Sequence, residues 1–235
     1  MPPFKKPPRC YQPRGFEIIH EDRDIIVGIK AAGFLTVAAA WNRDRTIHSA
    51  LNEYVRKGNS KSHKRVFVVH RLDQDTSGVM IYAKSYEAQT KLKDNWKSAV
   101  KIYYAVVHGR LKQKSGTFTS YLSEDDDYVM HSHRKKAEGK LAQTEYKVVK
   151  ETPKFSLVKI NLLTGRKNQI RVHLADEGHP VVGDAKYREG PTKYQRLALH
   201  SWSISFPHPF SRERLTFEAP VPDHFRTLVG EWDEK

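Results

Sequence analysis

The chain has 235 residues, with 41 Lys and Arg against 27 Asp and Glu, and a formal net charge of +14. Hydrophobic residues make up 38% of the sequence and aromatic residues 11%, which excludes global disorder because a chain of this length can bury a sizeable core. The single cysteine, Cys10, excludes an intramolecular disulfide framework and a zinc site built on cysteines. We see no secretory signal and no apolar stretch long enough to span a bilayer, so we expect a cytoplasmic protein.

The positive charge favours a polyanionic partner: nucleic acid, an anionic membrane or an acidic protein. A membrane partner is disfavoured because we find no long basic amphipathic helix. Nucleic acid is favoured because the basic residues cluster and aromatic residues lie among them. The stretch from Arg56 to Arg65 holds five basic residues and no acid, so it is either a surface loop or a segment that faces phosphates.

Residues 1–15 hold five of the twelve prolines and four basic residues, with no acid. We expect a flexible basic arm here and a single domain over residues 16–235. The domain begins with β-branched runs at residues 18–19 and 25–29, which predict two strands. The pair Ala32-Gly33 then turns the chain into a third apolar run at residues 34–37.

Two helices are predicted next, each with a capping residue. Thr46 precedes apolar residues at helical spacing over residues 47–55, and Ser85 precedes a face made by Ala88, Leu92 and Trp96. Between them, residues 66–69 and 79–83 predict two buried strands around a polar block. Further strands are expected at residues 101–108, 116–121, 142–149, 155–163, 197–206 and 213–218, and one more helix from about Lys167 to Glu177. The predicted fold class is therefore α+β, a mixed and mainly antiparallel sheet with a few flanking helices.

The polar block from His70 to Gly78 lies between the two apolar strands, a placement that holds polar groups on a rigid support. Its carboxylates imitate the opening of an EF-hand, but position twelve is Lys84 and the flanks are strands, so calcium is rejected. The His70-Arg71 pair is similar to a kinase catalytic loop, yet the order is His-Arg-Leu-Asp and the sequence has no glycine-rich loop or Asp-Phe-Gly, so a kinase is rejected. The remaining structural interpretation is a turn in which Asp73 or Asp75 accepts backbone N–H bonds.

Three further segments each allow a structural interpretation. The stretch from Thr164 to Leu174 is read as an amphipathic helix with a basic, solvated side, although its arginines and glutamine also suit contacts to phosphate or uracil. Strand alternation puts Tyr103 and Tyr104 on opposite faces, and the period does not indicate which one faces a site. The acidic residues 124–127, followed by His131 and His133, are read as a solvated loop, not a metal site.

Taken together, three blocks resemble the RluA family of pseudouridine synthases: His70-Arg71-Leu72-Asp73-x-x-Thr76-Ser77-Gly78, Lys101-x-Tyr103-x-Ala105-x-Val107-x-Gly109 and Thr164-Gly165-Arg166-x-x-Gln169-Ile170-Arg171-Val172-His173. Weaker similarities are Glu21-Asp22-x-Asp24, Lys30-Ala31-Ala32-Gly33, Gly178-His179-Pro180-Val181-Val182-Gly183-Asp184-x-x-Tyr187 and Arg196-Leu197-x-Leu199-His200. The resemblance covers roughly residues 16–222. This chain departs from the family in having Asn168 where His is usual and Ala31 where Pro is usual. The N-terminal S4 module of larger relatives is not expected here.

The resemblance implies an isomerase that converts uridine to pseudouridine in structured RNA, in tRNA or ribosomal RNA stem-loops. The reaction is a rearrangement, so neither a cofactor nor a metal is expected, and we expect a monomer. Asp73 would be the catalytic carboxylate, acting as nucleophile at C1′ or as base at C2′. Arg171 would keep that carboxylate charged, and Tyr103 would stack on the flipped uracil. The expected RNA-binding residues are Arg71, Arg166, Gln169, Lys61, Lys64 and Arg65.

Two other classes of protein remain open at this point. A catalytically silent RNA-binding protein would use the same basic surface, but it has no need of Asp73, Tyr103 and Arg171 together. A basic protein that docks an acidic partner would account for the charge and not for the three blocks.

Overall fold

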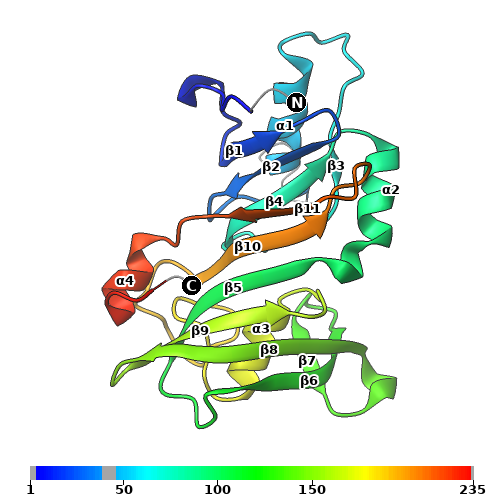
Figure 1. The fold of residues 1–235 in the computed structure, drawn as a ribbon. Helices are drawn as coiled ribbons and strands as arrows, with labels where there is room; N and C mark the ends of the chain where they lie inside the picture. The colour runs from blue at the N-terminus through cyan, green and yellow to red at the C-terminus, as the bar shows by residue number, and fades with distance from the viewer. Residues whose placement is uncertain (1–3, 39–45, 234–235) are drawn as a thin grey trace. The chain divides into compact units, whose positions relative to one another are not determined.

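The fold is described from a computed structural model, which describes residues 4–38 and 46–233. The chain divides into two compact units (Figure 1). The first unit comprises residues 1–99 and 203–219, and the second comprises residues 100–202 and 220–235. Strand β10 (Leu199–Pro207) passes from one unit into the other at residue 203.

The first unit is built on a sheet with two helices beside it, and the pairs β1–β2, β2–β4, β3–β4 and β10–β11 are antiparallel. Its strands are β1 (Phe16–Glu21), β2 (Ile25–Lys30), β3 (Phe67–Val68), β4 (Ser77–Ala83), the second part of β10 and β11 (Arg214–Glu218). Its helices are α1 (Ile47–Arg56) and α2 (Tyr86–Asp94), with short 3₁₀ turns η1 (Arg9–Tyr11) and η2 (Trp96–Ser98). The strand order is β1-β2-β4-β10, with β11 paired to β10 and β3 paired to the end of β4.

The core of the first unit follows from alternation along the strands. Ile25 and Val27 of β2 and Val79 and Ile81 of β4 point to the same side, where α2 covers them with Ala88 and Leu92, among other residues. The N-terminus of α2 is closed by Ser85, whose hydroxyl accepts a hydrogen bond at 3.1 Å from the backbone N–H of Ala88. Both capped helices were predicted with their first residues, and both predictions are confirmed.

The third apolar run, residues 34–37, is not one of the strands of the sheet. Within the described part of the chain this segment makes a single parallel bridge, between Leu35 and Thr46. The Thr36 hydroxyl bonds to the backbone of Leu72 in the polar block, while the backbone O atoms of Leu35 and Thr36 accept from the N–H groups of Ile47 and His48 at the start of α1.

The second unit is an antiparallel sheet with two helices packed against its strands. Its strands are β5 (Val100–His108), β6 (Ser115–Glu124), β7 (Met130–His133), β8 (Lys140–Glu151), β9 (Phe155–Leu162) and the first part of β10; its helices are α3 (Gln169–Asp176) and α4 (Asp223–Val229), with a 3₁₀ turn η3 (Lys136–Glu138). The order β5-β9-β8-β6-β7 is antiparallel throughout. The α+β fold class is confirmed.

Helix α3 is not the half-solvated helix that the sequence suggested. Residues 169–174 are all buried, because the helix lies against β7 and β8 instead of on the surface (Figure 1). Even His173 is buried: its Nδ1 lies 2.8 Å from Thr144 Oγ1 and its Nε2 lies 2.9 Å from Ser120 Oγ. Burial lowers the pKa of His173 from 6.5 to about 4, so the ring is neutral at physiological pH.

The N-terminal basic segment makes specific contacts with β1 where the structure describes it. Gln12 accepts a hydrogen bond at 2.8 Å from the backbone N–H of Ile18, and Lys6 forms an ion pair with Glu17. Whether this segment also contacts RNA stays a prediction. Across the described residues, we find no helix with the length and apolarity that crossing a membrane requires.

Candidate active site

The polar block of residues 70–78 forms a turn that is tied down on several sides within the first unit. The hydroxyl of Thr36 donates at 2.8 Å to the backbone O of Leu72 and accepts at 3.2 Å from its N–H. His70 Nε2 accepts from the backbone N–H of Ile81 at 3.1 Å. The turn itself is closed by a 3.2 Å bond from the N–H of Thr76 to the backbone O of Asp73. Asp73 thus sits half-buried on a loop with little freedom to move.

Lys30, which was given no role in the site from the sequence, also holds this loop in place. The Lys30 side chain is completely buried, and its Nζ donates to the backbone oxygens of Ala31 at 2.9 Å, Phe34 at 2.8 Å and Gln74 at 2.8 Å. An ammonium group has three donors, so all of them are used. Because Gln74 is the neighbour of Asp73, Lys30 fixes the backbone that carries the carboxylate.

Two carboxylates of the polar block, Asp73 and Asp75, favour the positive charge on Lys30. Burial lowers the pKa of Lys30 to about 7, while the charges of Asp75 and Asp73 act to raise it. A lysine that closes the end of an apolar strand was the signal in the sequence. Lys30 entered only as part of a weaker similarity and was given no role, because a lysine at a strand end is more often exposed.

In the second unit, Arg171 is held in a fixed orientation by Asp184. Its Nε donates to Asp184 Oδ2 at 2.7 Å and its Nη2 donates to Oδ1 at 2.8 Å, a bidentate pair. The side chains are only 10% and 0% exposed. Burial by itself would raise the pKa of Asp184, but hydrogen bonds and the charge from Arg171 lower it below 3.8. Asp184 is therefore a site residue that the sequence analysis noted in a motif without assigning a role.

The loop that leads into α3 is organised by Gln169. Its Oε1 accepts from Thr164 Oγ1 at 2.8 Å and from the backbone N–H of Arg166 at 3.0 Å, while its Nε2 donates to Thr144 Oγ1 at 2.9 Å and to the backbone O of Gln143 at 3.0 Å. The amide is buried and shapes the loop instead of facing solvent. Arg166 is exposed at the tip of that loop.

The two tyrosines of β5 separate as strand alternation requires. Tyr104 is fully buried and its ring lies 5.3 Å from that of Trp202 and 6.1 Å from that of Trp232, measured between centroids. Tyr103, which is 6% exposed, projects from the other side of the strand, opposite Ile160 in register. Tyr104 is thus part of an aromatic core cluster, which leaves Tyr103 as the candidate for contact with substrate.

The remaining predicted residues lie on the surface of the first unit. Arg71, Lys61, Lys64 and Arg65 are all exposed, and the Arg65 guanidinium lies 5.0 Å from the centroid of the Phe67 ring. Of the three predicted catalytic residues, Asp73 belongs to the first unit while Tyr103 and Arg171 belong to the second. The pairing of Asp73 with Arg171 stays a prediction.

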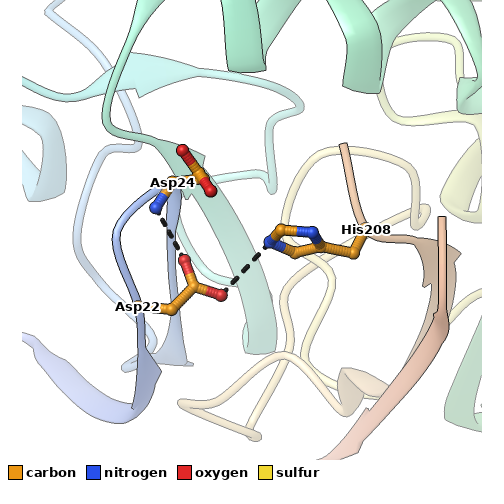
Figure 2. Close-up of side chains that lie close together, drawn as sticks. All are labelled: Asp22, Asp24 and His208. Atoms are coloured by element: carbon orange, nitrogen blue, oxygen red, sulfur yellow. Dashed lines mark hydrogen bonds and ion pairs between the residues drawn. The ribbon is translucent and has the colours of Figure 1, made fainter. Parts of the chain in front are cut away.

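One cluster in the first unit has ligand types that could suit a metal: Asp22, Asp24 and His208 (Figure 2). Asp22 Oδ1 accepts from the backbone N–H of Asp24 at 2.7 Å and of Ile25 at 2.8 Å, which closes the turn between β1 and β2. Its Oδ2 lies 3.2 Å from His20 Nε2 and 3.3 Å from His208 Nε2.

The proton on His208 decides what this cluster does. His208 Nδ1 accepts from the backbone N–H groups of Phe210 at 3.4 Å and Ser211 at 3.1 Å, so in the neutral ring the proton sits on Nε2, facing Asp22. A metal at Nε2 would force the proton onto Nδ1, against two N–H donors. Burial opposes the charge of Asp22, but hydrogen bonds from His20 and the backbone lower its pKa to about 2. The cluster therefore stabilises the turn between β1 and β2, and its hydrogen bonds do not fit a metal site.

The acidic segment with two histidines lies on the hairpin of β6 and β7. His131 and His133 are part of strand β7, which the sequence analysis took for loop. His131 Nε2 lies 2.6 Å from Asp125 Oδ2, and His133 Nε2 lies 2.8 Å from Ser123 Oγ. Each histidine is therefore engaged with its own neighbour on the hairpin.

Comparison with known proteins gives these features a family. The model of the RNA pseudouridylate synthase family matches residues 24–176. The RNA pseudouridine synthase YhcT of Bacillus subtilis is 35% identical over 216 residues, covering 90% of this chain and 70% of its own. Ribosomal large subunit pseudouridine synthase D of Neisseria meningitidis is 34% identical over 235 residues, covering 93% of this chain and 62% of its own. The structure of human RNA Pseudouridylate Synthase Domain Containing 4 has a TM-score of 0.75 and 24% identity, with 90% of each chain covered, which shows a shared fold.

The class of protein is thus an isomerase that acts on RNA. The chain belongs to the RNA pseudouridylate synthase family, and the resemblance to its RluA branch is confirmed.

Proposed function

We propose that this protein isomerises uridine to pseudouridine in stem-loops of structured RNA, with ribosomal RNA as its first candidate substrate and tRNA as the second. The preference for ribosomal RNA rests on relatives that are named ribosomal large subunit pseudouridine synthases. The net charge of +14 and the exposed basic residues of the first unit suit a polyanionic substrate.

The observation that supports the proposed mechanism best is that hydrogen bonds hold the loop of Asp73 in a fixed position. Its loop is fixed by Thr36, by His70 and by the three hydrogen bonds of Lys30. A reacting group gains most when its geometry is set before the substrate arrives. Asp73 is proposed as the carboxylate that meets the ribose of the flipped nucleotide, as nucleophile at C1′ or base at C2′.

Cleavage of the bond between C1′ and N1 builds positive charge on the sugar, which a carboxylate stabilises or captures. The uracil then rotates, C5 bonds to C1′ and loses its proton, and N1 gains a proton in place of its bond to C1′, so atoms balance without a cofactor. Arg171 is proposed to keep Asp73 ionised, and Tyr103 to stack on the extruded base. The bidentate pair with Asp184 holds the guanidinium of Arg171 in one orientation, which supports this role.

RNA contacts are proposed for the exposed cations Arg71, Arg166, Lys61, Lys64 and Arg65, with Gln169 shaping the loop of Arg166. Such contacts make binding depend strongly on salt.

The experiment is release of tritium from 5-tritiated uridine in transcripts of ribosomal RNA and of tRNA. The proposal predicts release with time from at least one of these, and faster release from ribosomal RNA. A silent RNA-binding protein would bind both transcripts and release tritium from neither, which would overturn the proposal.

A further inference from the structure

The second unit contains a cavity of about 460 Å³ that no part of the proposed mechanism uses. It opens at the end of β5 and β9, where His108 and Phe155 face each other in register, and the loop of residues 188–194 forms its other wall. Its lining residues are His108, Lys154, Phe155, Arg188, Pro191, Lys193 and Tyr194. The composition is therefore aromatic and basic, with no Asp or Glu among these described lining residues.

Three rings meet in this cavity. The centroid of His108 lies 5.6 Å from that of Phe155 and 6.0 Å from that of Tyr194, and the last two rings lie 5.8 Å apart at 81°. Tyr194 is half-buried, so part of its ring is open to solvent. Aromatic faces of this kind stack nucleobases regardless of sequence.

The cations are arranged around the rings. Lys193 Nζ lies 5.5 Å from the Tyr194 centroid, and Lys193 and Lys154 are both exposed. Arg188 donates to the backbone O of Pro191 and so fixes the loop that carries Lys193 and Tyr194. Exposed ammonium groups beside a stacking surface match the charge pattern of one nucleotide, in which a flat base is followed by a phosphate.

His108 adds an unsatisfied polar atom. Its Nε2 is buried and has no hydrogen-bond partner among the described residues, which is uncommon for a buried polar atom. Burial and the charge of Arg188 lower the pKa of His108, so this ring contributes aromatic surface and not positive charge to the cavity wall.

We propose that this cavity binds one single-stranded nucleotide of the RNA substrate, with the base against Tyr194 and the phosphate between Lys193 and Lys154. The proposal rests on the proposed function, because it takes RNA to be the substrate. The cavity would then hold RNA outside the nucleotide that reacts.

The test measures fluorescence anisotropy of a labelled oligouridylate of about ten nucleotides. Tyr194→Ala is expected to weaken binding by at least about fivefold, and Tyr194→Phe to restore it, because the ring and not the hydroxyl stacks. The matched control is Tyr86→Ala, which removes a tyrosine that is 71% exposed and lines no part of this cavity.

A second pair of variants removes one positive charge each. Lys193→Gln is expected to reduce the slope of log K against log salt by about 0.7, while Lys135→Gln, an exposed lysine outside the cavity, leaves it unchanged. If Tyr194→Ala melts early in circular dichroism, the lysine pair decides alone, since both lysines are exposed.

The two proposals fail in different ways. No tritium release by the wild-type protein from either transcript overturns the proposed function. If the wild-type protein isomerises RNA while Tyr194→Ala and Lys193→Gln bind the oligouridylate as their controls do, the cavity proposal alone is overturned. It is also overturned if uridine 5′-monophosphate competes as tightly as the oligomer, since the site would then recognise a free nucleotide.

Discussion

Asp184→Asn removes the charge that holds Arg171 and keeps the shape of the side chain. The carboxylate accepts two charge-assisted hydrogen bonds, at 2.7 and 2.8 Å, from a pair that is 10% and 0% exposed. Its Oδ1 also accepts from the backbone N–H groups of Lys186 at 2.9 Å and Tyr187 at 3.1 Å. An asparagine can keep these backbone bonds through Oδ1, but its NH₂ group then faces the N–H of Arg171.

The expected loss follows from this geometry. Hydrogen bonds to charged groups contribute about 1.5–3 kcal/mol each, and removing one partner of a buried ion pair costs about 3–5 kcal/mol. Since solvent screens this pair little, we expect the free energy of unfolding at pH 7 to fall by about 3 kcal/mol or more. The assay is urea unfolding followed by tryptophan fluorescence, with unchanged m-values as the check on two-state behaviour.

The dependence of the unfolding free energy on pH, measured below pH 7, tests the same reasoning. The folded pKa of Asp184 lies below its ordinary value of 3.8, so its contribution is present above pH 3.8 and is lost as the pH falls through the folded pKa. The difference between wild type and Asp184→Asn should stay constant from pH 7 to pH 5 and shrink below pH 3.8.

The matched control is Glu231→Gln, which removes the partner of Arg226 at the surface. That pair is 3.0 Å apart, and the glutamate is 82% exposed, so little change is expected in stability. The reasoning would be refuted if both substitutions cost the same, or if the Asp184 difference persisted unchanged below its folded pKa.

Four further results are expected. Lys30→Met should lower the unfolding free energy by about 3 kcal/mol in urea titrations, because three backbone carbonyls lose their donor. The same variant should also release tritium more slowly. Unchanged stability and rate would show that Lys30 does not fix the loop. Because of His173, the wild-type protein should lose about 3 kcal/mol of unfolding free energy between pH 7 and pH 4, since the folded ring takes up its proton only near pH 4 while the unfolded ring does so near 6.5. His173→Gln should lack this loss, and parallel pH profiles of stability for the two proteins would contradict the prediction. Gly28→Ala should cost about 1–3 kcal/mol in thermal unfolding, because its Cβ would meet the Phe16 ring, and a neutral effect would argue against that contact. Tyr103→Phe should retain more turnover than Tyr103→Ala in single-turnover tritium release, and equal losses would indicate that the hydroxyl is needed.

Local signals in the sequence predicted much of the fold. Thr46 and Ser85 were identified as N-caps because a hydroxyl preceded an amphipathic run, and both accept the expected bond. The long strands followed from β-branched periodicity. Strand β7 was missed because Met130–His133 is short and polar, and its place comes from pairing with β6. Helix α4 was missed as well, since the run Asp223–Val229 is only seven residues long and offers less than two turns of helical periodicity.

The candidate site depends on contacts between residues that lie far apart in the sequence, which local patterns do not predict. Asp73 and Arg171 were identified through resemblance, while the roles of Lys30 and Asp184 depend on partners distant in sequence. Lys30 reaches Gln74 across 44 positions, and no local pattern encodes that contact. Helix α3 was misjudged for the same reason, because Arg171 and His173 look like solvated residues until Asp184, Ser120 and Thr144 are placed around them.

The central claim is that the carboxylate of Asp73 performs the isomerisation, and single-turnover tritium release by Asp73→Asn tests it most directly. Asp75→Asn is the matched control, since both carboxylates act on Lys30 and each substitution removes one charge from the same loop. The account predicts that Asp73→Asn loses at least about 10⁴-fold in rate while its RNA affinity and melting temperature match those of Asp75→Asn. Turnover by Asp73→Asn within tenfold of that control would contradict it.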